Sequence, residues 1–209
     1  MKKNKAIRIF ILLLDMLLLL AFVQKTSAQS EDSKENKFLK AFIPDYVRIQ
    51  FAGQVGMISV GPGWNFLDKK IKTEVFYGYL PVRYSTAEVN TLGIKTSYLP
   101  ISLKREGFFN KISPYVLASI NMTISDGSKT FIKNPNNFPK GYYSPTSIRI
   151  SPGIGINMTH DLKEGYYIKD LDLYFETVTN NVYLDYLFTN RTVKVNDVFS
   201  LAIGVRVGF

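Results

Sequence analysis

VFSLAIGVRVGF, residues 198–209, is the stretch that decides the fold of this chain. Every second residue from Phe199 to Phe209 is apolar, and the residues between them are small or charged. This strict alternation predicts a β-strand with two different faces. A fully apolar strand face must be shielded from water, and a lipid bilayer is one environment that shields it. The apolar face carries Phe199, Leu201, Ile203, Val205, Val207 and Phe209, and the opposite face carries Ser200, Ala202, Gly204, Arg206 and Gly208.

The same stretch resembles the closing strand of small bacterial outer-membrane β-barrels of the OmpA/OmpX type. In that family the last strand combines spaced apolar residues, a glycine and a terminal phenylalanine, and the assembly machinery reads it during insertion. The resemblance implies an assembly signal made of Gly204, Val205, Val207 and Phe209.

The amino-terminal segment predicts export from the cytoplasm. Basic residues within 2–8 precede an apolar run at 9–23 that only Asp15 interrupts, and Thr26–Ala28 offers small residues for cleavage. We interpret residues 1–28 as a secretory signal peptide. The alternative, a transmembrane anchor, is disfavoured because the run is shorter than the roughly 20 residues that a spanning helix needs.

The composition describes a single exported domain. Five of the 26 basic and one of the 17 acidic residues lie in 1–28, so the remaining 181 residues contain 21 basic and 16 acidic residues. This mild excess contains no Lys/Arg run, and no nucleic-acid partner is expected. The absence of cysteine excludes disulfides and a lipoprotein signal. The 13 Tyr and 15 Phe with one Trp are typical of barrel girdles, although an aromatic-rich soluble sandwich would share these totals.

From Tyr46 onward, alternating segments predict an all-β fold, an eight-stranded antiparallel up-and-down transmembrane β-barrel at 46–209. Residues 29–45 are interpreted as a periplasmic N-terminal segment, either ending in a short helix or disordered throughout. Connections after the third, fifth and seventh strands tend to be longer than the others, and no helix of useful length is expected between strands. The predicted strands cover about 47–52, 58–66, 71–79, 92–98, 115–122, 148–158, 171–178 and 198–209.

Alternation alone does not decide which face is inside, because a soluble lipocalin-like barrel would turn its apolar face inward. The polar face of the predicted strands is rich in Gly, Ser and Ala, which suit a narrow lumen and have no evident use on a solvated surface. We therefore predict that the polar face lines the lumen and the apolar face meets lipid. Pro62 and Pro152 lie on the apolar face and should mark bulges or strand ends.

Eight charged residues on the polar face are predicted to form a lumen charge network. An unpaired charge in a closed lumen would destabilise the fold, so we expect the basic residues to pair with the acidic ones. Arg206 should lie close to Asp172 or Glu176. The alternative is a water-filled lumen in which each charge is solvated. Lys95 and Arg149 lack an obvious acidic partner. The predicted network comprises Arg48, Lys72, Glu74, Lys95, Arg149, Asp172, Glu176 and Arg206.

Residues for catalysis or metal binding are scarce. His160 is the single histidine, and it stands beside Asp161 in a turn predicted at 160–169. Lipid A deacylases of this architecture place a serine two residues after the histidine, whereas Leu162 occupies that position here. With one His and no Cys, no metal site and no cofactor are expected.

The sequence therefore predicts a non-catalytic integral protein of the cell outer membrane that presents external loops or supports envelope integrity. About eight strands leave an interior that side chains fill, so a pore is not expected. The expected partners are outer-membrane lipids, including lipopolysaccharide, and the barrel-assembly machinery and periplasmic chaperones during biogenesis; a monomer is expected. Two alternatives remain, a lipid-modifying barrel enzyme that acts on lipid A or phospholipid, and a soluble secreted ligand-binding barrel.

Overall fold

The computed structural model describes residues 42–85, 88–125, 148–162, 167–190 and 192–209. Residues Pro44–Phe209 form one compact unit. The predicted signal peptide, most of the segment at 29–45 and most of the loop predicted at 125–146 lie outside the described residues. Within the described ranges, no helix is long and apolar enough to cross a membrane.

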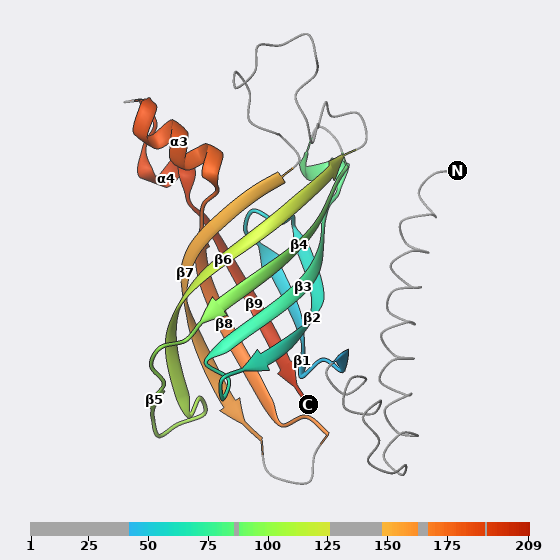
Figure 1. Ribbon diagram of the computed structural model, residues 1–209, viewed down its shortest axis with the longest axis vertical. Helices are drawn as coiled ribbons and strands as arrows, with labels where there is room; N and C mark the ends of the chain where they lie inside the picture. Colours follow the sequence, from blue (N-terminus) through green and yellow to red (C-terminus); the bar gives the residue numbers. More distant parts are fainter. Residues whose placement is uncertain (1–41, 86–87, 126–147, 163–166, 191) are drawn as a thin grey trace, which may run out of the picture. The chain divides into compact units, whose positions relative to one another are not determined.

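Residues Pro44–Phe209 form a closed antiparallel β-barrel (Figure 1). Its strands are β1 (Tyr46–Ala52), β2 (Ile58–Phe66), β3 (Ile71–Leu80), β4 (Val89–Tyr98), β5 (Leu103–Lys104), β6 (Lys111–Ser125), β7 (Ile148–Asp161), β8 (Asp170–Val178) and β9 (Ser200–Gly208). Seven wall strands follow one another around the ring, and β9 pairs with β1 to close it. The short β5 continues β4 beside the lower part of β6. The predicted eight-stranded antiparallel barrel is thus confirmed.

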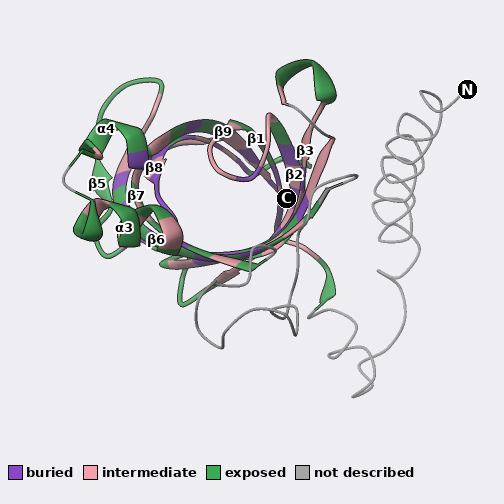
Figure 2. Ribbon diagram, turned by 90° about the horizontal axis from the view of Figure 1, so that it is seen from above, coloured by how far each residue is buried: buried purple, intermediate pink, exposed green. Residues whose placement is uncertain are grey.

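Each wall strand alternates between a buried interior face and an exposed exterior face (Figure 2). On β9, for example, Ala202 and Arg206 are buried, whereas Leu201 is 75% exposed. The interior is polar and the exterior is apolar, as the content of small residues predicted. Large exposed apolar residues occur on every wall strand, among them Ile49, Ile58, Val75, Ile94, Ile120, Ile154, Phe175 and Ile203.

Three prolines lie where the hydrogen-bonded ladders are interrupted. The β2–β3 pairing is broken at Pro62, Pro114 lies between the β4 and β5 pairings of β6, and Pro152 lies just beyond the last β7–β8 pair, Gly153–Val178. A proline has no amide hydrogen to donate, so these are the positions where it costs the ladder least. The prediction of a bulge or strand end is wrong for the first and third of these prolines, because Pro62 and Pro152 lie inside β2 and β7 and the β2–β3 register is the same on both sides of Pro62.

The expectation that no helix interrupts the strands is wrong. Between β8 and β9 the chain forms α3 (Asn181–Thr189) and α4 (Val195–Val198), and the β3–β4 connection contains the 3-10 turn η2 (Val82–Tyr84). The side chain of Asn180 caps α3 by accepting hydrogen bonds from the amides of Val182 and Tyr183. This cap satisfies two of the backbone donors that a helix start leaves open.

Candidate functional site

Glycines on the interior face make room for tyrosine rings inside the barrel. Three interior tyrosines, all nearly fully buried, each stand directly opposite a glycine of the neighbouring strand. A Cβ atom on any of these glycines would lie 2.2–2.4 Å from a ring carbon. Each ring therefore lies across the bare backbone of its neighbour. The pairs are Tyr46–Gly63, Tyr115–Gly155 and Tyr174–Gly204.

We expect Gly204→Ala to destabilise the barrel by about 1–3 kcal/mol, as overpacked interiors do. The ring of Tyr174 is 0% exposed and its hydroxyl donates to Gln50 Oε1 at 3.0 Å, so it has no free space into which to shift. Urea unfolding of the refolded protein measures the change. In a Tyr174→Ala background the same glycine substitution should be neutral, and an equal loss in both backgrounds would contradict the packing argument.

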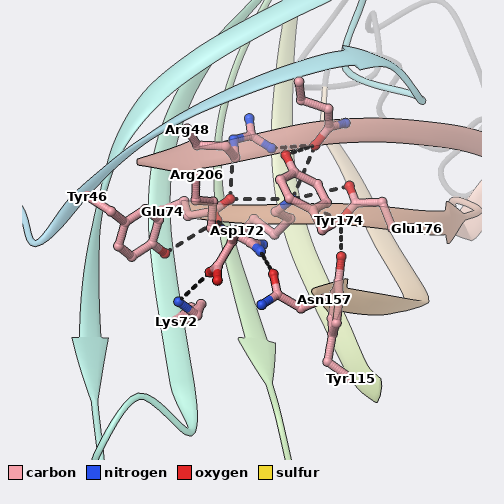
Figure 3. A network of polar contacts seen from close by, with 12 residues as sticks. Tyr46, Arg48, Lys72, Glu74, Tyr115, Asn157, Asp172, Tyr174, Glu176 and Arg206 are labelled. Atoms are coloured by element: carbon pink, nitrogen blue, oxygen red, sulfur yellow. Dashed lines mark hydrogen bonds and ion pairs between the residues drawn. The ribbon is translucent and has the colours of Figure 1, made fainter. Parts of the chain in front are cut away.

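Glu74 on β3 lies at the centre of a cluster of charges inside the barrel (Figure 3). Its carboxylate oxygens lie 2.6 Å from Arg206 Nε, 3.2 Å from Arg48 Nε and 3.3 Å from Lys95 Nζ. The hydroxyl of Tyr46 donates to the same carboxylate at 3.3 Å. All these side chains are buried, so one carboxylate holds three cations that come from β9, β1 and β4.

Glu176 extends the cluster across the lumen. Lys95 Nζ lies 3.0 Å from Glu176 Oε2 and donates to Oε1 at 3.1 Å, and the hydroxyl of Tyr115 donates to Oε2 at 3.0 Å. The side-chain oxygen of Gln50 joins this group, because it accepts hydrogen bonds from Arg48 at 2.6 Å and from Lys95 at 3.2 Å.

Asp172 forms the third acidic position. It accepts hydrogen bonds from Lys72 Nζ at 2.9 Å and from Thr159 Oγ1 at 2.5 Å. The neighbouring Arg206 donates instead to Asn157 Oδ1 at 2.9 Å, and its guanidinium carbon lies 4.0 Å from the centre of the Tyr174 ring. Such a cation–π contact gains strength when both groups are removed from water.

A further ion pair lies between the β2–β3 turn and the start of β8. Lys69 Nζ lies 2.5 Å from Asp170 Oδ2. Partial burial acts to lower the pKa of Lys69, but the hydrogen bond to Asp170 and its negative charge outweigh it, so the pKa lies above its ordinary value. Lys69 therefore stays cationic across the physiological pH range.

Seven of the eight predicted network residues are brought together by these contacts. The expectation that Lys95 has no acidic partner is wrong, because Lys95 contacts both Glu74 and Glu176. Arg206 stands opposite Asp172, as expected, but its ion pair is with Glu74. The eighth residue, Arg149, is half-buried farther along β7. Sequence reasoning did not assign the uncharged partners to the network, although most of them lie on the same alternating polar face. These partners are Tyr46, Gln50, Ser59, Tyr115, Asn157, Thr159 and Tyr174.

The cluster resolves a repulsion that the strand register creates. Arg48 on β1 and Arg206 on β9 stand directly opposite each other, and like charges at such positions destabilise a sheet. Both guanidinium groups reach Glu74 from opposite sides. Gly61 and Gly63 of β2, the strand between β1 and β3, add no side chain of their own here, and the ring of Tyr46 lies over Gly63. The carboxylate therefore stabilises the seam at which the barrel closes.

Side chains fill the lumen beside the cluster. The cavity that Arg48, Lys95, Asn121 and Glu176 help to line measures about 10 Å³, roughly the space for one water molecule. A much larger depression of about 830 Å³ lies on the outside, where exterior side chains of β1, β6, β7, β8 and β9 form apolar walls. The described part of the barrel is thus packed inside and grooved outside.

The two residues considered for catalysis, His160 and Asp161, each contact other groups. His160 and Asp161 are the last two residues of β7, so their predicted placement in a turn is wrong. The ring of His160 stacks on Phe108 with centroids 4.2 Å apart, and its Nδ1 contacts the Phe108 carbonyl oxygen. Asp161 pairs with Lys111 at 2.5 Å. Among the described residues, no group of three His, Cys, Asp or Glu side chains could hold a metal ion.

The residues of the expected assembly signal lie along β9 and just after it. Gly204 is buried, Val205 and Val207 are half-buried on the exterior face, and Phe209 is exposed. The amide of Phe209 donates to the carbonyl oxygen of Asp45 at 2.9 Å. Their role in assembly stays a prediction.

Comparison with known proteins adds no further guide to function. No family model, no curated protein and no solved structure matches this chain. The arrangement of charges inside and apolar side chains outside therefore carries the functional argument.

Proposed function

We propose that this chain is a non-catalytic integral β-barrel of the bacterial outer membrane. Its role is to hold external loops on a rigid, lipid-embedded cylinder. The observation that carries the proposal is the inverted polarity of the barrel. Four cations and three carboxylates are buried inside, while the exposed exterior of every wall strand is apolar. The interior residues are Arg48, Lys72, Glu74, Lys95, Asp172, Glu176 and Arg206.

The form of the sheet supports a bilayer as the cover of this exterior. A continuous apolar surface of this extent is rare on soluble monomers. Lipid offers no partner for an open strand edge, and the β1–β9 pairing closes the ring, so that every wall strand is paired on both sides over most of its length. Seven of the eight wall strands have nine or more residues, which reaches the about 9–11 residues of a membrane-spanning strand.

The packed lumen favours a structural or loop-presenting role over conduction. Charged residues from five of the eight wall strands meet in the charge cluster, and the cavity beside it holds about one water molecule. Outer-membrane lipids, including lipopolysaccharide, would be the surroundings of the exterior. Assembly factors and periplasmic chaperones would be transient partners, as the resemblance of the last strand implies.

The first test is cell fractionation with heat-dependent gel migration. We expect the protein in the outer-membrane fraction, and unboiled samples should migrate differently from boiled ones because a closed hydrogen-bonded barrel resists detergent until it is heated. Recovery of the folded protein from the soluble periplasm or the medium would overturn the membrane proposal and favour the soluble ligand-binding barrel.

A further inference from the structure

Helix α3 is docked on an edge of β7 that no strand covers. The β7–β8 ladder ends at the pair Gly153–Val178, but β7 continues beyond it to Ile148. There the amide of Ile150 donates to the side-chain oxygen of Asn181, the first residue of α3, at 3.2 Å. The start of the helix thus satisfies part of an exposed strand edge.

The helix lies beside the barrel wall. Seen along the barrel, α3 and α4 stand outside the ring of strands next to β7 and β8 (Figure 2), and in the side view they lie at the upper rim on the same side (Figure 1). The wall next to the docking point is apolar, since Ile148, Ile150 and Ile120 are all exposed on its exterior. On β6 the wall continues past Ile120 to Ser125.

Aromatic and aliphatic side chains cover most of the surface of α3. Positions 181, 185 and 189 recur every four residues and form one polar stripe, which includes the single charged residue of the helix, Asp185. Outside the stripe, Tyr183 is 42% exposed, Tyr186 is 52% exposed and Phe188 is 83% exposed. Val195 on α4 and Leu201 on β9 are also exposed. A helix surrounded by water would leave these rings without cover.

We propose that helices α3 and α4 form an anchor that lies in the interface between the headgroups and acyl chains of the outer leaflet. Tyr and Phe suit this boundary because their rings are apolar and the tyrosine hydroxyl can reach water. Interfacial helices bury an apolar face about 5–10 Å into the boundary and keep a polar face outward. The stripe at Asp185 provides that polar face. This inference rests on the proposed membrane location of the barrel.

The chain contains one tryptophan, so the fluorescence of a single residue can be followed in each protein. Trp64 lies on β2 with its side chain on the exterior face, so its fluorescence in the unmodified protein reports whether the barrel is inserted. For the helix, Phe188→Trp is made in a Trp64→Phe background. Both full-length proteins are refolded into phosphatidylcholine vesicles that carry bromine atoms near the headgroups or near the chain ends.

We expect the Phe188→Trp protein to show blue-shifted emission that headgroup-proximal bromines quench most. The matched control is Thr189→Trp in the same background, because it places the reporter on the polar stripe one residue away. Its emission should be quenched by aqueous acrylamide and little by bromolipid.

The outcomes separate the two proposals. Quenched Trp64 with an unquenched, acrylamide-accessible Phe188→Trp reporter would overturn the anchor and leave the barrel inserted. Unquenched Trp64 would overturn the membrane location itself. A Phe188→Trp emission shift that grows with the protein-to-lipid ratio would identify a second copy of the chain as the cover and would also overturn the anchor. Should Phe188→Trp fail to fold, Tyr186→Trp supplies the same readout.

Discussion

Glu74→Gln should destabilise the barrel by about 3–5 kcal/mol, the range seen when one member of a buried ion pair is removed. The substitution keeps the shape of the side chain but removes the charge that Arg48, Lys95 and Arg206 share. It also leaves Arg48 directly opposite Arg206 with no anion between them. Urea unfolding of the refolded protein, followed by tryptophan fluorescence, measures the loss.

A double-mutant cycle shows whether the loss comes from pairing. In an Arg206→Met background, Glu74→Gln should lower the free energy of unfolding by a smaller amount, because only two cations then lose their carboxylate partner. Coupling energies for such contacts are about 0.5–3 kcal/mol. The control is Lys111→Gln, which breaks a pair with Asp161 whose side chains are more than one-third exposed and should cost at most about 1 kcal/mol. Strictly additive losses at positions 74 and 206 would mean that each charge is separately solvated.

Ile154→Arg is expected to cost about 2–4 kcal/mol in lipid, the penalty for arginine near the midplane on the outer face of a membrane barrel. Ile154 lies at the middle of β7 and is 64% exposed. On a water-exposed surface the same change would stay within about 0.5 kcal/mol. Unfolding measured in phospholipid vesicles gives the value.

The control for this substitution is Leu67→Arg. Leu67 is exposed to a similar extent, 68%, but it lies in the turn between β2 and β3, outside the strands. We expect little change there because the arginine reaches water at the barrel end. Equal costs at the two positions would argue that both face the same solvent, and the lipid-facing exterior would be refuted.

The strands and their faces were predictable because the two-residue repeat is a property of the backbone itself. The small Gly, Ser and Ala residues on one face indicated that this face lines a narrow lumen. The interior position of Arg48, Glu74 and Arg206, which lie on the same face, followed without knowledge of the tertiary structure. Helix α3 was not predictable in the same way. It contains valine, tyrosine and phenylalanine, which form helices poorly, and its stability depends on docking against β7. Asn180, a residue type that often caps helices, was the one local feature of the sequence that indicated a helix start here.

The partners of the charges depended on register and stagger, which a single sequence does not define. Glu74 and Lys95 stand directly opposite each other. This pairing could be predicted only if the length of the β3–β4 connection, and so the register of the two strands, were known. Arg206 stands opposite Asp172 on β8, yet its guanidinium reaches across to Glu74 on β3. That reach is created by the curvature of the closed sheet and could not be derived from neighbouring positions alone.

The position of Glu74 has a consequence for the order of folding. It is separated from Arg206 by 132 positions along the chain, and its cations come from the first, fourth and last wall strands. Contacts between such distant segments form late, because the loop entropy of the whole intervening chain opposes them. The ion cluster is therefore completed only in the step that joins β9 to β1. A sheet that stops short of this step lacks the contact between Arg206 and Glu74, which makes ring closure a cooperative event.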